Sequence, residues 1–117
     1  MTLPQPKIRL SVRLDLPNGD RFGPGMATLL EQIAQTGSIR SAATALGMSY
    51  PKALKLVDAM NAAFANTLID TRHGGQDRGG AALTETGRRV LELYRQICDQ
   101  AVAGGHTVLA EFEGLLE

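Results

Sequence analysis

Three short helical stripes, closely spaced between residues 23 and 64, constrain the fold more than any other feature of this chain. Gly37 and Gly47 stand where the first two helices should end, and Ser38 and Ser49 stand where the next two should begin. Helices this short, joined by turns this tight, predict a helix-turn-helix, although ordinary helical bundles use the same pattern. The apolar side chains that recur at helical spacing are Met26, Leu29, Leu30 and Ile33, then Ile39, Ala42, Ala43 and Leu46, then Ala53, Val57, Met60 and Phe64.

The segments on either side of the helices alternate as strands do. Residues 8–16 are apolar at every second position, which predicts a half-buried strand, and the Asn18-Gly19 turn allows residues 21–22 to pair back. Residues 67–73 alternate again, with Leu68 and Ile69 on opposite faces. A glycine-rich tip and a return strand over residues 81–83 follow, so a second hairpin is expected.

A long helix is predicted to complete the domain. Thr84 is a natural N-cap, Glu85 suits the positive first turn, and an apolar stripe runs from Val90 to Ala101. We expect Gly104-Gly105 to bend or interrupt this helix before an apolar face restarts. The order of elements predicts a fold that is mainly α with a small β component, a winged helix-turn-helix with a long C-terminal helix. The expected domain covers residues 1–100, and residues 101–117 form a C-terminal helical extension.

Two runs of residues carry a more specific signal. They are Gly37-Ser38-Ile39, Ala42-Ala43, Gly47, Ser49-Tyr50, Ala53 and Met60-Asn61, and then Arg72, Gly74-Gly75, Gly79-Gly80-Ala81, Leu83-Thr84, Gly87, Leu91 and Leu93-Tyr94. Across roughly residues 8–100 the chain resembles the DNA-binding domain of the molybdate-responsive ModE-type transcription regulators. LysR-type regulators share the helix-turn-helix and the Leu-Thr-x-x-Gly entry to the last helix, but not the glycine-rich wing. Pro51 departs from the ModE pattern, which tends to carry there the lysine that stands here at position 52.

The resemblance implies a sequence-specific DNA-binding transcriptional regulator. Its recognition helix would span about residues 49–62 in the major groove, and its wing, about residues 74–80, would lie on a flanking groove or on the backbone. Each candidate contact has a plainer alternative: Ser49 as a simple cap, Tyr50 as a core aromatic, and the cations as solvated charges. The candidate DNA-binding residues are Ser38, Arg40, Ser49, Tyr50, Pro51, Lys52, Lys55, Arg72, Arg78 and Arg88.

A homodimer is the expected assembly, because helix-turn-helix domains commonly read two half-sites. The apolar run near the C-terminus is larger than a lone helix can hide, unless the segment folds back on its own domain. The candidate dimerisation residues are Leu91, Tyr94, Cys98, Val108, Leu109, Phe112, Leu115 and Leu116.

Charge is unevenly distributed along this neutral chain. Twelve basic residues balance twelve acidic ones, yet residues 38–95 carry eight basic against five acidic groups, and residues 96–117 carry four acidic groups and no basic one. The modest basic excess leaves an alternative open, a winged-helix protein–protein interaction module that does not bind DNA. Because the chain ends where the ModE family continues into molybdate-binding modules, we expect no molybdate binding by these residues. A molybdate response would require a separate molybdate-binding protein.

Several other classes of function are not expected. The segment Gly74–Gly80 lacks the Lys-Ser/Thr ending of a phosphate loop, and Cys98, His73 and His106 lack metal-ligand spacing. We therefore expect no enzyme activity, no cofactor and no metal site. No apolar run approaches the ~18 residues of a membrane span, and a single cysteine suits a reducing compartment, so a soluble cytoplasmic protein is predicted.

Overall fold

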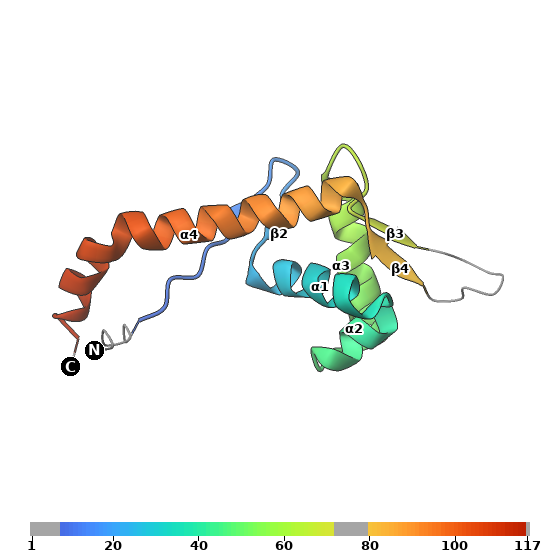
Figure 1. The fold of residues 1–117 in the computed structure, drawn as a ribbon, viewed down its shortest axis with the longest axis horizontal. Helices are drawn as coiled ribbons and strands as arrows, with labels where there is room; N and C mark the ends of the chain where they lie inside the picture. Colours follow the sequence, from blue (N-terminus) through green and yellow to red (C-terminus); the bar gives the residue numbers. More distant parts are fainter. Residues whose placement is uncertain (1–7, 72–79, 117) are drawn as a thin grey trace.

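The computed structural model describes residues 8–71 and 80–116, and it has the predicted order of elements (Figure 1). A small hairpin precedes three helices, and a second hairpin follows them. The long last helix lies across one end of these elements (Figure 1). The fold is mainly α with a small β component, as the sequence predicted. The elements are β1 (Leu14–Asp15), β2 (Arg21–Phe22), α1 (Pro24–Thr36), α2 (Ile39–Ala45), α3 (Tyr50–Ala63), β3 (Ile69–Thr71), β4 (Ala81–Leu83) and α4 (Glu85–Glu113).

The predicted helix ends are confirmed. Gly37 ends α1 with φ 73°, and Gly47 turns the chain between α2 and α3 with φ 69°, both in the left-handed region that favours glycine. The Ser38 hydroxyl accepts from the Ser41 N–H at 3.1 Å, and the Ser49 hydroxyl accepts from the Lys52 N–H at 3.3 Å. These caps satisfy N–H groups that have no partner within their own helices, and so fix where α2 and α3 begin.

The core lies where α1 meets the other elements. Leu29, Leu30 and Ile33 of α1 are fully buried, as the helical spacing predicted. Alanines at the contacts of α2 and α3 let these two helices cross at close range. Phe22 of β2 closes one side of the core, with its ring packed edge-on against that of Tyr94, 5.1 Å between centroids.

The second hairpin is tied to the helix-turn-helix at its base. Strands β3 and β4 pair antiparallel with Ile69 opposite Leu83, and the Ala81 N–H donates to the Gly37 carbonyl at 2.8 Å. The Asn61 side chain accepts from the N–H groups of Leu68 and Ile69 at 2.9 and 3.0 Å, and donates to the Ile69 carbonyl. The hairpin therefore has a fixed orientation relative to the end of α3.

Two sequence expectations are wrong, and one alternative of a third is excluded. Only Leu14–Asp15 of the predicted strand 8–16 is paired, because β2 provides just two residues before Pro24 begins α1. Leu68 and Ile69 are both buried instead of alternating, since Leu68 precedes the strand. Gly104-Gly105 does not interrupt α4, which continues to Glu113, although its last turns curve away from the earlier ones (Figure 1). The helix thus passes without a break from the expected domain into its extension.

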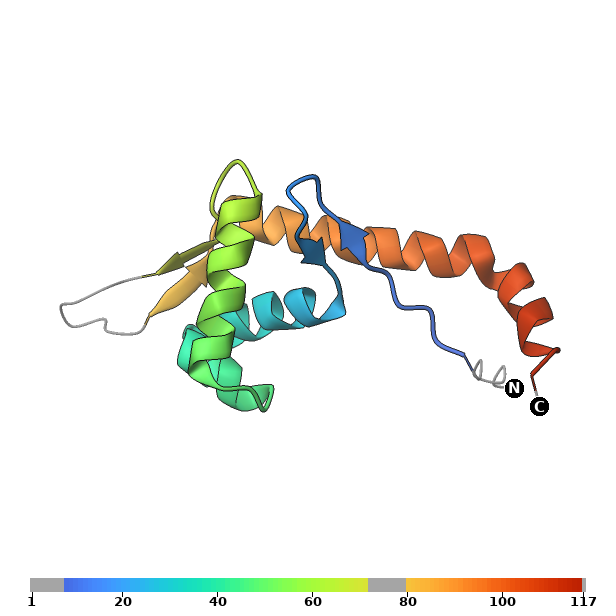
Figure 2. The same cartoon turned by 180° about the vertical axis from the view of Figure 1, so that it is seen from behind.

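The molecule is elongated because α4 projects well beyond the core (Figures 1 and 2). Its radius of gyration is 17.1 Å, whereas a compact domain of this length would have about 13 Å. Residues 8–13 run beside the projecting helix. The Tyr94 hydroxyl donates to the Val12 carbonyl at 2.6 Å, and the Ile8 N–H donates to the Glu113 carboxylate at 3.3 Å.

Candidate nucleic-acid interface

The start of α3 presents a basic, solvent-exposed surface. Ala53, Val57 and Met60 face the core, and Leu54 and Leu56 pack partly buried against it. Lys52 and Lys55 are exposed and lie one turn apart, with Pro51 in the same first turn. This is the part of the predicted recognition helix, about residues 49–62, from which long cationic side chains can reach a ligand.

A cation–π contact joins α2 to the start of α3. The Arg40 guanidinium carbon lies 4.2 Å from the centre of the Tyr50 ring, and Tyr50 itself is half-buried against the core. Such a contact is worth about 0.5–1 kcal/mol at an exposed site, and it holds an arginine beside the capped end of α3. Tyr50 therefore packs on the core and also positions a neighbouring charge. Sequence reasoning selected both residues but not their contact.

Ser38 has mainly a structural role in the described fold. Its hydroxyl caps α2, and its backbone forms a bridge with Gly80 at the base of the second hairpin. The side chain is only partly exposed. Ser38 and Ser49 are thus both helix caps, which is the plainer alternative given above for Ser49.

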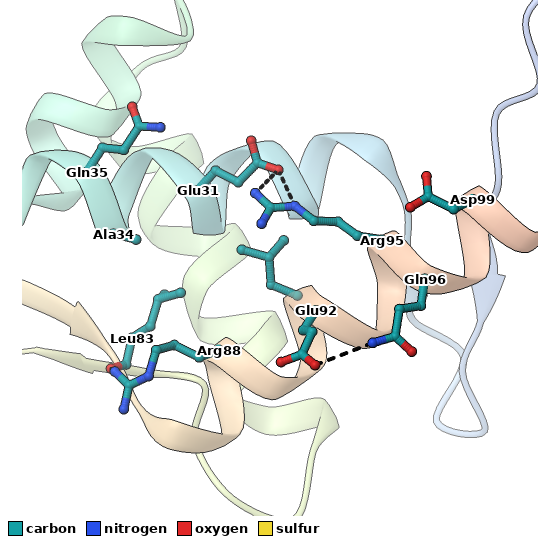
Figure 3. Close-up of a pocket in the computed structure, with 10 residues that line it drawn as sticks. Glu31, Ala34, Gln35, Leu83, Arg88, Glu92, Arg95, Gln96 and Asp99 are labelled. Carbon is teal, nitrogen blue, oxygen red and sulfur yellow. Dashed lines mark hydrogen bonds and ion pairs between the residues drawn. The ribbon is translucent and has the colours of Figure 1, made fainter.

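The remaining cationic candidates are Arg72, Arg78 and Arg88. Arg72, Arg78 and the wing tip, apart from Gly80, lie outside the described residues. Arg88 is turned toward β4, where its guanidinium donates to the Leu83 carbonyl at 3.0 Å (Figure 3). The structure does not bring Arg88 to the exposed face of α3.

Arg88 lines an open recess of about 480 Å³ between α1 and α4 (Figure 3). The Arg95 guanidinium there forms an ion pair with Glu31 at 2.6 Å, which ties α4 to α1. Glu92 and Asp99 also line the recess, so its charge is mixed. This distribution gives no net attraction for an anionic polymer.

The candidate dimerisation residues divide into two groups. Leu91 and Tyr94 are buried in the core, and Cys98 packs partly buried against it, so these three side chains offer little surface to a partner. Four of the five C-terminal candidates are exposed, with Leu115 at 85% and Val108 at 67%, and Leu109 is half-buried. Leu93 and Ile97, which are not among the candidate dimerisation residues, extend this apolar surface toward the domain. Their four-residue spacing on α4 was the available signal.

Tyr94 is the described residue whose acid–base behaviour the fold clearly changes. Burial raises the pKa of the Tyr94 phenol from 10.0 to about 12, and the neighbouring Cys98 adds to the increase through a hydrogen bond and its charge. The phenol therefore remains the donor to Val12 throughout the neutral range. This arrangement anchors the N-terminal segment on α4.

Residues 8–71 and 80–116 contain neither a candidate metal-binding cluster nor a helix that could span a membrane. No cluster of three or more His, Cys, Asp or Glu side chains in this part of the chain could hold a metal ion. None of the helices described combines the length and the apolar character that crossing a membrane requires.

The capped helix pair, the exposed start of α3 and the hairpin anchored beside it define a winged helix-turn-helix domain. The chain belongs to the bacterial regulatory helix-turn-helix proteins of the LysR family, whose family model matches residues 26–88. Solved structures agree with this assignment. The crystal structure of the CbnR_DBD-DNA complex has a TM-score of 0.58 and 25% identity, covering 74% of this chain and 94% of that one.

Curated relatives point to the molybdate-responsive branch that the sequence resembles. The molybdenum-pterin-binding protein MopB of Rhodobacter capsulatus is 38% identical over 95 residues, 81% of this chain and 34% of the relative. The transcriptional regulator ModE of Yersinia pestis is 39% identical over 71 residues, 61% of this chain and 27% of the relative. The chain thus spans between about a quarter and a third of the length of these relatives.

Proposed function

We propose that this chain is a sequence-specific, DNA-binding transcriptional regulator that reads duplex DNA with α3. The observation that carries the proposal is the exposed, basic start of α3, held by the Ser49 cap and by the Arg40–Tyr50 contact. The likeness to a domain solved in complex with DNA, over nearly all of that domain, supports the same use of the surface.

Helix α3 has the dimensions for the major groove. Its 14 residues span about 21 Å, and with side chains it is about 10–12 Å across, close to the ~12 Å width of the groove. Lys52 and Lys55 would supply guanine or phosphate contacts, and Pro51 and Tyr50 would contribute apolar contacts to base edges. The hydroxyl oxygens of Ser38 and Ser49 accept the capping hydrogen bonds, so these residues would bind phosphate only through atoms that the caps do not use. Arg72 and Arg78 remain predicted wing contacts, and Arg88 is an accessory phosphate contact at most.

We also propose that the protein acts as a homodimer through α4. The apolar stripe on this helix is self-complementary if a second copy packs antiparallel with its crossing point at Gly104. Added atoms at Gly104 would meet nothing within 4 Å in the single chain, so a partner helix has room to approach there. In this arrangement three exposed or half-buried apolar residues on one side of Gly104 face three on the other side in the partner; they are Leu93, Ile97 and Ala101, and Val108, Phe112 and Leu115.

Such a symmetric interface presents the same surface from both copies. It leaves Leu91, Tyr94 and Cys98 in the cores of their own protomers, and Leu109 and Leu116 at the margin of the stripe. Residues 101–117 would then serve as the dimerising extension, and two copies of α3 would face successive half-sites, about 34–36 Å apart on the DNA.

Sedimentation equilibrium tests the dimer with a matched pair of variants. Val108→Asp places a charge in the stripe and should yield monomers, because an unpaired carboxylate would be buried. Val102 is 46% exposed but lies on another side of α4, so Val102→Asp should leave the dimer intact. A monomeric wild-type chain, or equal association of both variants, would refute the interface.

Retention on heparin and on mixed-sequence duplex DNA tests the proposed DNA binding. A DNA-binding protein should be retained at low salt and eluted as salt rises, because cationic contacts release counterions from the polymer. A winged-helix module specialised for protein partners should flow through. We place the regulator in the cytoplasm, where its DNA lies, and propose binding without catalysis. Residues 96–117 carry four acidic groups and no basic one, so they offer an oxyanion no cationic partner, and we propose that molybdate would act through a separate molybdate-binding protein.

A further inference from the structure

A second basic surface lies beside α3, on the side away from the β3–β4 hairpin. Figures 1 and 2 show β1–β2 and β3–β4 on opposite sides of this helix. An open recess of about 420 Å³ separates α3 from the N-terminal hairpin. Its cationic lining residues are Arg13 and Arg21 from the hairpin segment and Lys52 from α3, and none of its lining residues is acidic.

The composition of this recess distinguishes it from the one between α1 and α4, where three carboxylates accompany two arginines. Met48 and Leu56 of the helix-turn-helix supply apolar lining between the cations. A surface that combines several cations with no carboxylate concentrates positive potential and attracts a polyanion. Lys52 belongs both to this recess and to the exposed start of α3, so the two basic surfaces are continuous.

Arg13 already has a partner, but a weak one. Its guanidinium lies 3.2 Å from the Asp15 carboxylate, with 55% and 68% of the two side chains exposed. Ion pairs this exposed contribute little and are readily exchanged. A phosphate offers the guanidinium a stronger, bidentate partner. Arg21 is exposed, and the neighbouring Asp20 carboxylate accepts a hydrogen bond from the Asn18 amide.

We infer that Arg13 and Arg21 bind backbone phosphates of the DNA on the side of α3 opposite the β3–β4 hairpin. The inference rests on the proposed function, since it requires α3 to occupy the major groove. A helix that fills the groove faces one phosphate backbone on each side. The β3–β4 hairpin lies toward one backbone, and the N-terminal hairpin with its two arginines lies toward the other. These contacts carry no sequence information but fix the register of α3 on the duplex.

The salt dependence of binding tests this inference. Fluorescence anisotropy with a mixed-sequence duplex gives the slope of log K against log salt for the wild-type chain and for Arg13→Gln/Arg21→Gln. Loss of two phosphate contacts should reduce the magnitude of the slope by about 2. Arg13→Lys/Arg21→Lys retains both charges and should retain the slope, which separates charge from any effect on folding.

Arg9→Gln/Arg89→Gln is the matched control. It removes the same charge from exposed positions, and the Arg89–Glu92 pair at 2.9 Å resembles the Arg13–Asp15 pair in exposure. This control should keep the wild-type slope. If the wild-type chain binds DNA with a steep slope and Arg13→Gln/Arg21→Gln keeps it, the hairpin contacts are refuted while the proposed function stands. If the wild-type chain does not bind DNA, the proposed function itself fails.

Discussion

Gly87→Ala should destabilise this protein even though alanine is the better helix former. A Cβ atom at position 87 would lie 2.1 Å from the Leu68 carbonyl oxygen and 3.0 Å from its carbon, both backbone atoms that cannot rotate away. To relieve the contact, α4 must move about 1 Å from the segment that leads into β3.

Hydrogen bonds oppose that movement. The Thr84 N–H donates to the Leu68 carbonyl at 2.9 Å, and the Thr84 hydroxyl donates to the Thr67 carbonyl at 2.6 Å. Overpacking of this kind costs about 1–3 kcal/mol, weakened hydrogen bonds cost about 0.5–1.5 kcal/mol each, and the gain in helix propensity returns at most about 1 kcal/mol. The net loss should be about 2 kcal/mol, which lowers the melting temperature by on the order of 10 °C.

Gly25→Ala is the matched control, because an added Cβ at this position in α1 meets nothing within 4 Å and the backbone has an ordinary helical conformation. It should leave the free energy of unfolding unchanged or raise it by a few tenths of a kcal/mol. Urea denaturation of the two variants and the wild-type chain provides the comparison. Equal stability of Gly87→Ala and the wild type would refute the close approach of α4 to residue 68.

Three further results are expected. Asn61→Ala should lower the free energy of unfolding, measured by urea denaturation, by about 2 kcal/mol, because it leaves the N–H groups of Leu68 and Ile69 without their acceptor. Asn61→Asp keeps an acceptor and should lower it less. A larger loss for Asn61→Asp than for Asn61→Ala would contradict this role. In a Tyr50→Phe variant, ultraviolet absorbance should show Tyr94 ionising near pH 12 and not near 10. Because the pKa of Tyr94 is raised in the folded state, the stability linked to its phenol is complete below pH 10 and declines as the pH rises from 10 toward 12. Ionisation of Tyr94 near pH 10 would contradict its burial. Calorimetry of this 117-residue chain should detect no molybdate binding, whereas micromolar affinity would overturn the expectation drawn from its acidic C-terminal residues.

Features fixed by neighbouring residues were predictable from the sequence. The caps at Ser38, Ser49 and Thr84 and the left-handed turns at Gly37 and Gly47 depend on a few adjacent residues, and each is present where predicted. The apolar spacing of the first three helices likewise identified their buried faces. The predicted strand 8–16 is shorter than expected because strand pairing depends on a partner, and Pro24 limits the length of β2.

Features that depend on contacts distant in sequence were not predictable. The alternation of residues 8–16 identified an extended segment but not its position beside α4, where Tyr94 binds Val12. The apolar stripe of α4 could not separate core from surface, because the helix leaves the core along its length, burying Tyr94 and exposing Val108. The basic recess joins Arg13 to Lys52, 39 positions apart, through the packing of the hairpin against α3.

Charge reversal on α3 shows whether this helix binds DNA. Fluorescence anisotropy with duplex DNA selected from the source genome would compare the wild-type chain, Lys52→Glu/Lys55→Glu, and Arg9→Glu/Arg89→Glu, which makes the same charge change at exposed positions away from α3. Thermal melting would verify that all three are folded. The lysine variant should lose binding, while the arginine variant should keep most of it. Equal binding by the lysine variant and the wild type would show that α3 does not read DNA.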